Sequence, residues 1–577
     1  MDNSYIIAID FGTAYSGYAF SLTKREAETE PRLKYWGKQV SQRTPKTPTC
    51  ILFDEHEKFL SFGYEAQSAY FRTRGDEARK NFFFECFKMS LYGKKLNSEV
   101  TIEAANGRSM KALKVFAEAL RYLKEDALKF ISENSASDFT WVVTVPAIWD
   151  PSAKQFMREA ATQAGIVTAG KEDRLVIALE PEAASVWCKK LPADGFEREK
   201  NSEVTFEQAS GTQYIVVDCG GGTIDITVHE VLEGGALKEL HKASGNDLGG
   251  QTVDNKFKEF LKEIFSDNLW DAYEKEHPGE LQKMMYDISI LKEIDDDDVD
   301  ISCPYNLGEM AKEKQKMEKF FEFLRGVSWN QGAIKISKQK VRSFYAESLN
   351  GITKSLREIL KKDFTIKYIL LVGGYARSLI LRQHITNHFG GQCKVLCPSH
   401  PQEAIMKGAV MFGRNPALVA SRISAFTYGV SLSNRFDASK HRADKKHTNK
   451  EGEWCDGIFC VLVRENEEVG WDKTSEYSCT PIERDQTAVI FAFYRTERNI
   501  QGLMYVDEWG VENIGSIILE SPDTARGMNR EIKLQIKFGA TEMTVTAIDV
   551  DSGSTVRTEL DFMAKSKRSI RNNVWQK

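Results

Sequence analysis

The chain has 577 residues, of which 42% are hydrophobic and 28% are charged, and its formal net charge is -5. This length exceeds what one core can stabilise and predicts several folded units, while the small negative charge excludes a general attraction to nucleic acid. No apolar run approaches the roughly 18 residues that a membrane helix needs, and a strand-like segment begins at Tyr5, so we expect neither a membrane span nor a signal peptide, but a cytoplasmic protein.

The first predicted element is a hairpin in "YIIAIDFGTAYSGYAF", residues 5–20. A hydrophobic strand ends at Asp10, a turn begins at Gly12, and a second strand-like run follows. The stretch "YIVVDCGGGTIDITV", residues 214–228, repeats this order of residue types, with Asp218 ahead of three consecutive glycines. A degenerate repeat about 200 residues apart predicts two related lobes that face each other.

Between these hairpins, residues 140–166 predict a buried strand that runs into a helix. Asp150 is the expected N-cap, Pro151 the first helical residue and Gly165 the stop signal. A second predicted helix begins at Glu180. These elements support an α/β fold class.

Residues 251–362 are highly charged and place phenylalanine and leucine at three-to-four spacing, which predicts a helical subdomain inserted in the second lobe. A third glycine turn lies in "YILLVGGYARS", residues 368–378, directly after a continuous apolar strand. Glycine in such a turn allows a ligand to approach the main chain closely.

After about residue 413 the sequence changes to strict alternation of apolar and polar residues. Its clearest part predicts a β-hairpin whose inward-facing residues are Ile532, Leu534, Ile536, Phe538, Met543, Val545 and Ala547. Similar runs at 458–463 and 488–494 predict an all-β domain, a sandwich. Residues 434–454 are predicted to be a long polar loop.

The glycine turns match neither common phosphate-binding loop. A Walker loop needs a Gly-Lys pair, and a Rossmann loop opens a helix, whereas residues 219–231 continue as a strand. A hairpin turn can instead offer successive backbone N–H groups to an anion. Two such turns would hold a polyphosphate from both sides, with the Thr13 and Thr223 hydroxyls on phosphate oxygens. Asp10 and Asp218 would then face Mg²⁺ through bound waters. The alternative is two ordinary hairpins with acidic turns, and the repeated order of residue types favours the phosphate site.

Seven motifs within residues 5–413 resemble, in order and spacing, the ATPase domain of the seventy-kilodalton heat-shock chaperones, in the actin and sugar-kinase superfamily. They are "IAIDFGTAYSG", "VVTVPAIWD", "IALEPEAAS", "IVVDCGGGTIDI", "NDLGGQTVDN", "ILLVGGYARS" and "HPQEAIMKGAV". The β-rich strands after residue 413 also resemble the substrate domain of that family.

This resemblance implies an α/β protein in which a two-lobed actin-like ATPase domain, with a helical insertion in lobe II, precedes an all-β sandwich domain. The expected parts are lobe I at 1–210, lobe II at 211–413 with its helical subdomain at about 251–362, and a substrate-binding-like β-domain at 414–577. We expect no helical lid, because the sequence ends soon after the last predicted strand.

The resemblance also implies a site for ATP or ADP with Mg²⁺. Asp10 and Asp218 would lie near the metal. The implied cofactor-binding residues are Gly12, Thr13, Ala14, Tyr15, Gly220, Gly221, Gly222, Thr223, Gly249, Gly250, Gly373, Gly374, Tyr375 and Arg377. The implied catalytic residues are Lys88 on the transferred phosphoryl group, Glu180 and Asp225, which orient the metal and the attacking water, and Thr223.

Two segments depart from the pattern of the family. The interdomain linker, acidic and leucine-rich in the family, falls in residues 414–424, which read "RNPALVASRIS". Where the family clamps adenine with charged side chains, this sequence has Asp287, Ile290 and Leu291. These departures resemble the divergent twelfth-member branch of the family, its A and B types.

The implied function is that of an ATP-binding, slowly ATP-hydrolysing chaperone-like protein whose β-domain holds client or partner polypeptides. Co-chaperone partners depend on the linker, which differs here. Two alternatives stay open: a nucleotide-regulated scaffold that binds ATP or ADP without folding clients, and a small-molecule kinase of the same superfamily, in which the β-domain has no role. No nucleic-acid partner is expected.

Overall fold

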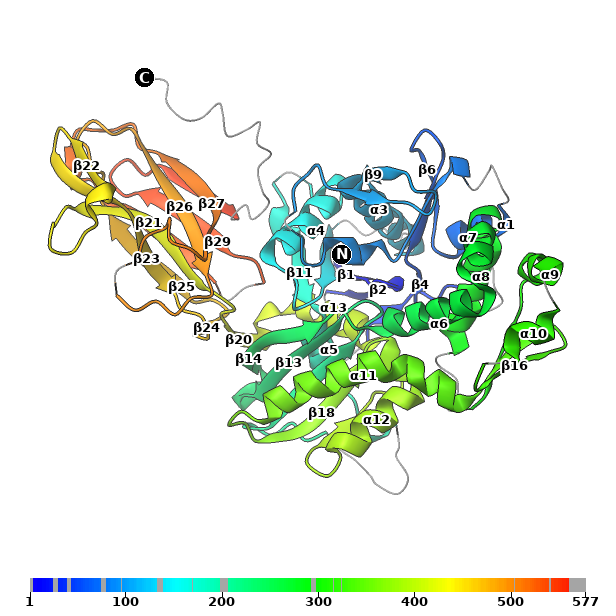
Figure 1. Ribbon diagram of the computed structural model, residues 1–577. Coiled ribbons are helices and arrows are strands. Elements are labelled where there is room, and N and C mark those ends of the chain that lie inside the picture. The colour runs from blue at the N-terminus through cyan, green and yellow to red at the C-terminus, as the bar shows by residue number, and fades with distance from the viewer. Residues whose placement is uncertain are drawn as a thin grey trace.

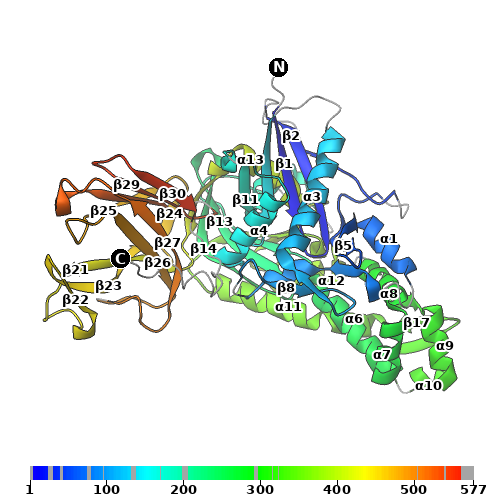
Figure 2. The same cartoon turned by 90° about the horizontal axis from the view of Figure 1, so that it is seen from above.

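The computed structural model describes residues 4–559, except 24–29, 39–42, 74–78, 95, 132–137, 169, 198–205, 292–296, 315, 323, 503 and 539–540. Strands and helices alternate as far as residue 414, so the predicted mixed α/β class is confirmed. Within the described part, no helix is long and apolar enough to cross a membrane. Figures 1 and 2 show the β-rich C-terminal part at one end of the molecule and helices α9 (Tyr305–Lys314) and α10 (Met317–Phe321) at the other.

The first large sheet contains the first predicted hairpin. Its strands run in the order β11-β10-β1-β2-β3, and β4 also pairs with β2. Their bounds are Ser4–Phe11 for β1, Tyr15–Leu22 for β2, Arg32–Leu33 for β3, Thr47–Pro48 for β4, Asp138–Val145 for β10 and Leu175–Leu179 for β11. Strands β1 and β2 pair antiparallel, as predicted.

Two cores cover the two faces of this sheet. Ile7 and Ile9 pack with α3 (Ala112–Ile131) and α4 (Pro151–Gln163). On the other face, Ile6 and Ala8 pack with α5 (Glu180–Cys188) and α13 (Ala404–Arg414). Successive side chains of a strand point to opposite faces, which explains why β1 is apolar at every position from Tyr5 to Ile9 rather than at every second one. The predicted caps of α4 are confirmed: the Asp150 side chain accepts a hydrogen bond from Ser152 N, and Gly165 follows with a φ of 70°.

A small sheet, a short hairpin and one helix complete the N-terminal part. The sheet has the order β6-β5-β7, and β8 pairs with β9. The bounds are Cys50–Phe53 for β5, Phe59–Phe62 for β6, Tyr64–Arg72 for α1, Phe82–Glu85 for β7, Thr101–Glu103 for β8 and Ser109–Lys111 for β9.

The second large sheet contains the second predicted hairpin and has the order β19-β18-β12-β13-β14-β20-β24. Its last two strands are β20 (Val419–Ile423) and β24 (Glu468–Gly470). The bounds are Gln213–Cys219 for β12, Ile224–Val231 for β13, Leu237–Asn246 for β14, Ile366–Val372 for β18 and Lys394–Leu396 for β19. Helix α12 (Leu379–Phe389) lies between β18 and β19 in sequence.

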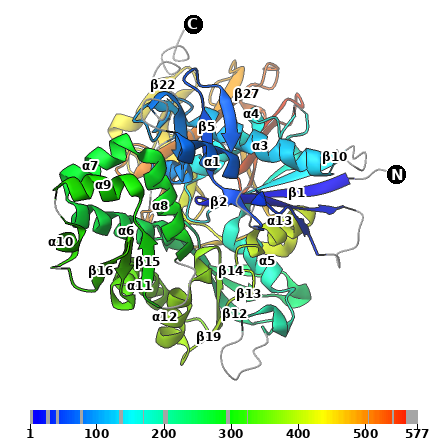
Figure 3. The same cartoon turned by 90° about the vertical axis from the view of Figure 1, so that its right-hand side faces the viewer.

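Helices α5 (Glu180–Cys188) and α13 (Ala404–Arg414) join the two sheets through one shared core. They lie side by side in Figure 3. Tyr214 and Val216 of β12 contribute to the same core as Ile6 and Ala8 of β1. The two hairpins are therefore held against a common pair of helices.

Residues 251–362 contain helices, as predicted, and also a small sheet that was not predicted. The remaining helices are α6 (Gly250–Phe265), α7 (Asp267–Glu276), α8 (Pro278–Leu291) and α11 (Lys338–Leu360). The sheet has the order β15-β17-β16, with bounds Val299–Ser302, Ala333–Ile336 and Val327–Asn330. Each of these strands has four residues, the shortest run over which alternation can indicate a strand. The acidic run before β15 lies partly outside the described residues.

The C-terminal part has two sheets, with orders β22-β23-β21-β26-β27 and β25-β28-β29-β30. The bounds are Thr427–Arg435 for β21, Lys446–Asn449 for β22, Gly452–Val463 for β23, Thr474–Cys479 for β25, Ala488–Thr496 for β26, Val511–Glu520 for β27, Ile532–Lys537 for β28, Thr544–Asp549 for β29 and Thr555–Glu559 for β30. Residues of both sheets form one core, as in a sandwich.

Two sequence predictions for this part have different outcomes. Strands β28 and β29 form the predicted hairpin, although its turn at 539–540 lies outside the described residues. The prediction of a long polar loop at 434–454 is wrong in part, because β22 pairs with β23 inside it. Exposed polar strands lack the apolar alternation by which strands are recognised.

The segment expected to link the two parts is itself a strand. β20 (Val419–Ile423) pairs in parallel with β14, and β24 (Glu468–Gly470) pairs with β20. Two strands from the C-terminal part of the sequence therefore extend the second large sheet. An ion pair of 2.6 Å between Arg495 and Asp150, and another between Arg158 and Glu542, also cross this junction.

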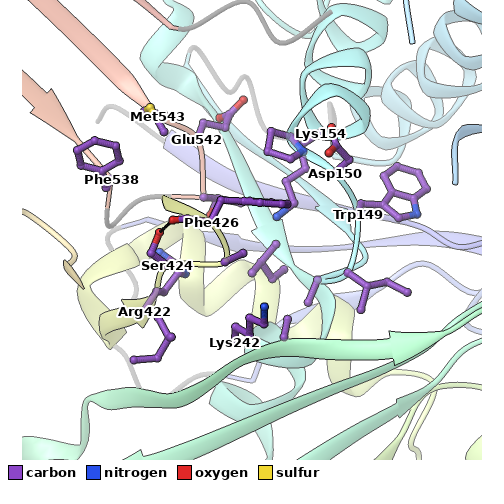
Figure 4. Close-up of a pocket in the computed structure, with 18 of the residues that line it drawn as sticks. Trp149, Asp150, Lys154, Lys242, Arg422, Ser424, Phe426, Phe538, Glu542 and Met543 are labelled. Carbon is purple, nitrogen blue, oxygen red and sulfur yellow. Dashed lines mark hydrogen bonds between the residues drawn. The ribbon is translucent and has the colours of Figure 1, made fainter. Parts of the chain in front are cut away.

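A cavity of 690 Å³ lies at the junction. Figure 4 shows Trp149 and Lys154 on one side of it, and Phe426, Phe538 and Met543 from the C-terminal part on the other. Glu239 of β14 also lines the cavity, is 4% exposed, and accepts a hydrogen bond of 2.8 Å from Ile423 N. Burial, and next the nearby Glu182 carboxylate, raise the pKa of Glu239 to about 8.

We expect Glu239→Gln to weaken the dependence of stability on pH. Because the pKa of Glu239 rises from 4.5 to about 8 on folding, its contribution is full below pH 4.5 and is lost as pH rises toward 8. The wild-type chain should lose at most about 1.4 kcal/mol per pH unit from this group, and the variant should not. Thermal denaturation across this range measures the difference. The exposed Glu497→Gln, in the same cavity, is the matched control, and equal slopes for wild type and Glu239→Gln would contradict the expectation.

Candidate functional site

The largest group of predicted site residues lines one cavity of 1190 Å³ between the two hairpins. The structure brings together here Asp10, Gly12, Thr13, Ala14, Tyr15, Lys88, Glu180, Asp218, Gly220, Gly221, Thr223, Gly250, Gly373, Gly374, Tyr375 and Arg377. Three predicted residues, Gly222, Asp225 and Gly249, do not line it and lie directly behind its wall.

The two glycine turns have the same geometry. A Cβ atom added at Gly12 would overlap the Tyr15 carbonyl oxygen, and one added at Gly220 would lie 2.9 Å from the Thr223 carbonyl oxygen, again three residues on. The turns also touch each other, since a Cβ atom at Gly221 would lie 2.9 Å from the Ala14 Cβ atom. Only glycine permits this close approach of two turns.

Gly249 and Gly250 support the second turn from behind. At the start of α6, the N–H groups of Gly249, Gly250 and Gln251 donate hydrogen bonds of 3.2, 3.0 and 2.8 Å to the carbonyls of Gly222, Gly220 and Gly221. Because the C=O and N–H of a trans peptide point in opposite directions, these bonds turn the following N–H groups away from α6. The family resemblance assigned Gly249 and Gly250 to cofactor binding. In the structure their N–H groups instead donate hydrogen bonds to the second glycine turn.

Four carboxyl groups are buried around the turns. Asp10, Glu180, Asp218 and Asp225 are 1%, 6%, 2% and 0% exposed. Lys88 Nζ lies 2.5 Å from Glu180 Oε1, and Lys46 Nζ lies 2.5 Å from Asp10 Oδ2. Two ammonium groups thus face four carboxyl groups, which leaves a surplus of two.

Burial raises the pKa of three of these carboxyls, and for Asp218 and Glu180 the neighbouring carboxylates add to the rise. Burial, and then the charges of Glu180, Asp225 and Asp10, raise the pKa of Asp218 well above its usual range. Burial likewise raises the pKa of Glu180, against the opposing effect of Lys88, and that of Asp225, against the hydrogen bond that its Oδ1 accepts from Ile148 N. Buried carboxylates are stable when a cation compensates them.

The carboxyl cluster fits a hydrated Mg²⁺ ion. Asp218 Oδ1 has no hydrogen-bond partner among the described residues, and Asp10 Oδ1 accepts a hydrogen bond of 3.1 Å from Thr144 Oγ1. In the part of the chain that the structure describes, no three His, Cys, Asp or Glu side chains lie close enough to hold a metal directly. Magnesium usually keeps several of its waters, so contact through water suits this donor set.

The third glycine turn, which the family resemblance places against the adenosine, also lines the cavity. Gly373 has a φ of 85°, and a Cβ atom there would overlap Asp218 Oδ1. On helix α8, Ile290 lines the cavity, whereas Asp287 pairs with Lys283 at 2.7 Å and Leu291 packs on the core. An apolar side chain therefore lies at this wall, and of the three residues at the altered adenine clamp only Ile290 reaches the cavity.

Sequence reasoning missed Lys46 and Thr144, which both contact Asp10. Thr144 is fully buried next to β1 on the parallel strand β10, so only the pairing of these strands reveals it. Lys46 stands between two prolines in "RTPKTP" and carries no periodic or motif signal.

Comparison with known proteins identifies the family of the chain. The family model described as Hsp70 protein matches residues 7–424. The chain is 34% identical to Heat shock 70 kDa protein 12A of Mus musculus, over 97% of this chain and 91% of that relative. It is 33% identical to Heat shock 70 kDa protein 12B of Homo sapiens, with the same coverage, and 21% identical to Chaperone protein DnaK of Anaplasma marginale, over 99% of this chain and 82% of that relative. The chain therefore belongs to the Hsp70 family, in the branch of the 12A and 12B proteins.

Proposed function

We propose that the chain binds ATP or ADP with Mg²⁺ between its two glycine turns, hydrolyses ATP slowly, and uses its C-terminal sheets to hold client or partner polypeptides. Membership of the Hsp70 family supports an ATP-binding, chaperone-like function. The observation that carries the proposal is the pair of facing turns beside a surplus of two buried carboxyl groups. This arrangement suits a polyphosphate and the divalent cation that accompanies it.

We assign the parts of the molecule as the sequence suggested. Residues 1–210 and 211–413 form two actin-like lobes, with a helical subdomain at about 251–362 and a partner-binding β-domain at 414–577. The assignment is supported by two large sheets that share helices α5 and α13. Strands β20 and β24 are the exception, because they extend the second sheet.

The proposed roles follow from position. Asp10 and Asp218 hold the waters of the metal, which when bound neutralises the charge of the phosphates. The turns at 12–15 and 220–223 bind the phosphates, while Gly373, Gly374, Tyr375 and Arg377 flank the adenosine. Lys88, held by Glu180 at 2.5 Å, faces the transferred phosphoryl group, and Glu180 orients the attacking water. Asp225 is assigned to the same water from the family resemblance, because it lies behind the cavity wall.

The second candidate is a nucleotide-regulated scaffold that binds ATP or ADP without folding clients. The apolar Ile290 at the adenine wall supplies no hydrogen bond to the base, so for either candidate it predicts weaker binding or a changed choice of base. A small-molecule kinase has less support, since it gives the C-terminal sheets no role. Co-chaperones and a cytoplasmic location stay predictions, and fractionation of cells that express the tagged chain checks the location.

Hydrolysis of Mg-ATP by the wild-type chain, Thr223→Ala and Asp10→Asn separates the first two candidates. Loss of a positioned phosphate or metal contact typically costs roughly a hundredfold in turnover, so wild-type turnover should exceed that of both variants. Equal rates for all three would support the scaffold instead. Unfolded peptide should bind the C-terminal sheets or change turnover, and if it does neither, the proposal of client binding is wrong.

A further inference from the structure

Lys46 reaches the acidic cluster from a segment that no motif covers. Its Nζ lies 2.5 Å from Asp10 Oδ2, and its side chain is only 12% exposed. The residue directly precedes β4, whose Thr47 and Pro48 pair with Ser16 and Tyr15 of β2. The pairing of β4 with β2 therefore fixes the backbone of Lys46 beside the first glycine turn.

A difference between the two hairpins makes room for Lys46. In the second hairpin Asp218 stands opposite Asp225, whereas in the first Asp10 stands opposite Gly17. A Cβ atom at Gly17 would lie 2.8 Å from the Pro45 carbonyl oxygen and 3.1 Å from Lys46 Cγ. The first hairpin thus has Gly17 where the second has the carboxylate of Asp225. The aliphatic part of the Lys46 side chain passes over Gly17.

Lys46 differs from the other lysines that line the cavity. Lys258 pairs with Glu274 at 2.6 Å, and Lys407 pairs with Glu403 at 2.9 Å, all outside the carboxyl cluster. Lys88 pairs with Glu180, which was assigned to orient water. The partner of Lys46, in contrast, is one of the two aspartates assigned to the metal.

The ammonium of Lys46 supplies positive charge where the metal would supply it. Without Lys46, one ammonium group would face four buried carboxyl groups. The charge of Lys46 also opposes the rise in the pKa of Asp218, although burial and three neighbouring carboxylates have larger effects. A flexible lysine side chain carries a compact charge that can turn from a carboxylate to a phosphate oxygen.

We propose that Lys46 is a nucleotide-binding residue that leaves Asp10 for a phosphate oxygen when an adenosine di- or triphosphate enters, so that nucleotide binding depends only weakly on Mg²⁺. This inference rests on the proposed nucleotide site. It deepens that proposal by assigning to the chain part of the charge compensation that a metal ion would provide. Lys46 lines the same cavity as both glycine turns, so phosphates held by those turns would lie in the space that its side chain borders.

Calorimetric titration of ADP into the full chain, with Mg²⁺ and then with EDTA, tests the inference. A charge-assisted hydrogen bond contributes enough for about a tenfold to hundredfold change in Kd. The wild-type Kd should therefore rise by less than about tenfold on removing Mg²⁺, whereas for Lys46→Met it should rise by about a further tenfold or more. Lys46→Arg should keep most of the wild-type behaviour in EDTA, because it keeps the charge.

The matched control is Lys258→Met, which removes a lysine from the same cavity, and its ratio of Kd values should equal that of the wild type. A wild-type Kd that rises by more than about tenfold in EDTA overturns the inference, as does an unchanged ratio of Kd values in Lys46→Met. Absence of binding even with Mg²⁺ would instead reject the proposed nucleotide site itself. The wild-type titrations need no variant, so a strong dependence of the wild-type Kd on Mg²⁺ overturns the inference even if Lys46→Met does not fold.

Discussion

Lys88→Met should bind nucleotide but hydrolyse ATP roughly a hundredfold to a thousandfold more slowly than the wild-type chain. Lys88 is 1% exposed, lies 2.5 Å from Glu180, and has its Nζ 5.3 Å from the centre of the Trp149 ring. A buried charge held from two sides is preorganised to stabilise the charge that develops on a transferred phosphoryl group. Without it, Glu180 also loses its cation and becomes neutral more readily, because burial already raises its pKa.

Single-turnover hydrolysis, with nucleotide affinity measured in parallel, separates these effects. Lys88 lies in a short 3₁₀ helix, Phe87–Leu91. The control is Lys94→Met, which changes an exposed lysine just after that helix and should hydrolyse ATP at the wild-type rate. If Lys88→Met hydrolyses as fast as Lys94→Met while both remain folded, Lys88 has no role in the chemistry.

Gly408→Ala should destabilise the chain by about 3 kcal/mol, and by more if the helices cannot separate. Gly408 lies in α13, where an added Cβ atom would overlap the Ala183 carbonyl oxygen of α5. These two helices form the core shared by both large sheets, so one methyl group forces apart elements from both hairpins. Glu180 and Lys88 should shift with the start of α5, and nucleotide affinity should fall.

Thermal denaturation and calorimetric titration measure the two consequences. Gly391→Ala is the matched control, because Gly391 is exposed and an added Cβ atom there would have no neighbour within 4 Å. A melting temperature of Gly408→Ala equal to that of Gly391→Ala would contradict the close packing of α5 and α13.

Local signals made much of this fold predictable. The hairpins around Gly12 and Gly220 were recognised because a continuous apolar strand, an aspartate and a glycine turn lie within a dozen residues of each other. Helix α4 was recognised from its two ends, since Asp150 and Gly165 satisfy backbone groups that the helix leaves unpaired. The cavity could be anticipated because the two hairpins repeat one pattern.

Features that depend on distant pairing were not predictable. β20 was expected as a linker, and only its pairing with β14, more than 170 residues earlier, makes it part of a sheet. β22 contains no apolar residue, and β15, β16 and β17 alternate buried and more exposed residues over only four positions each. The position of Lys46 beside Asp10 depends on the register of β4 against β2, and no pattern in "RTPKTP" predicts that register.

The structure of the full chain determined with ADP and Mg²⁺ tests the central claim most directly. We expect the phosphates between the turns at 12–15 and 220–223, the metal within water-mediated reach of Asp10 and Asp218, and the adenosine beside Gly373 and Gly374. Nucleotide found at another place, or a cavity that stays free of nucleotide at saturating concentration, would contradict the proposed function.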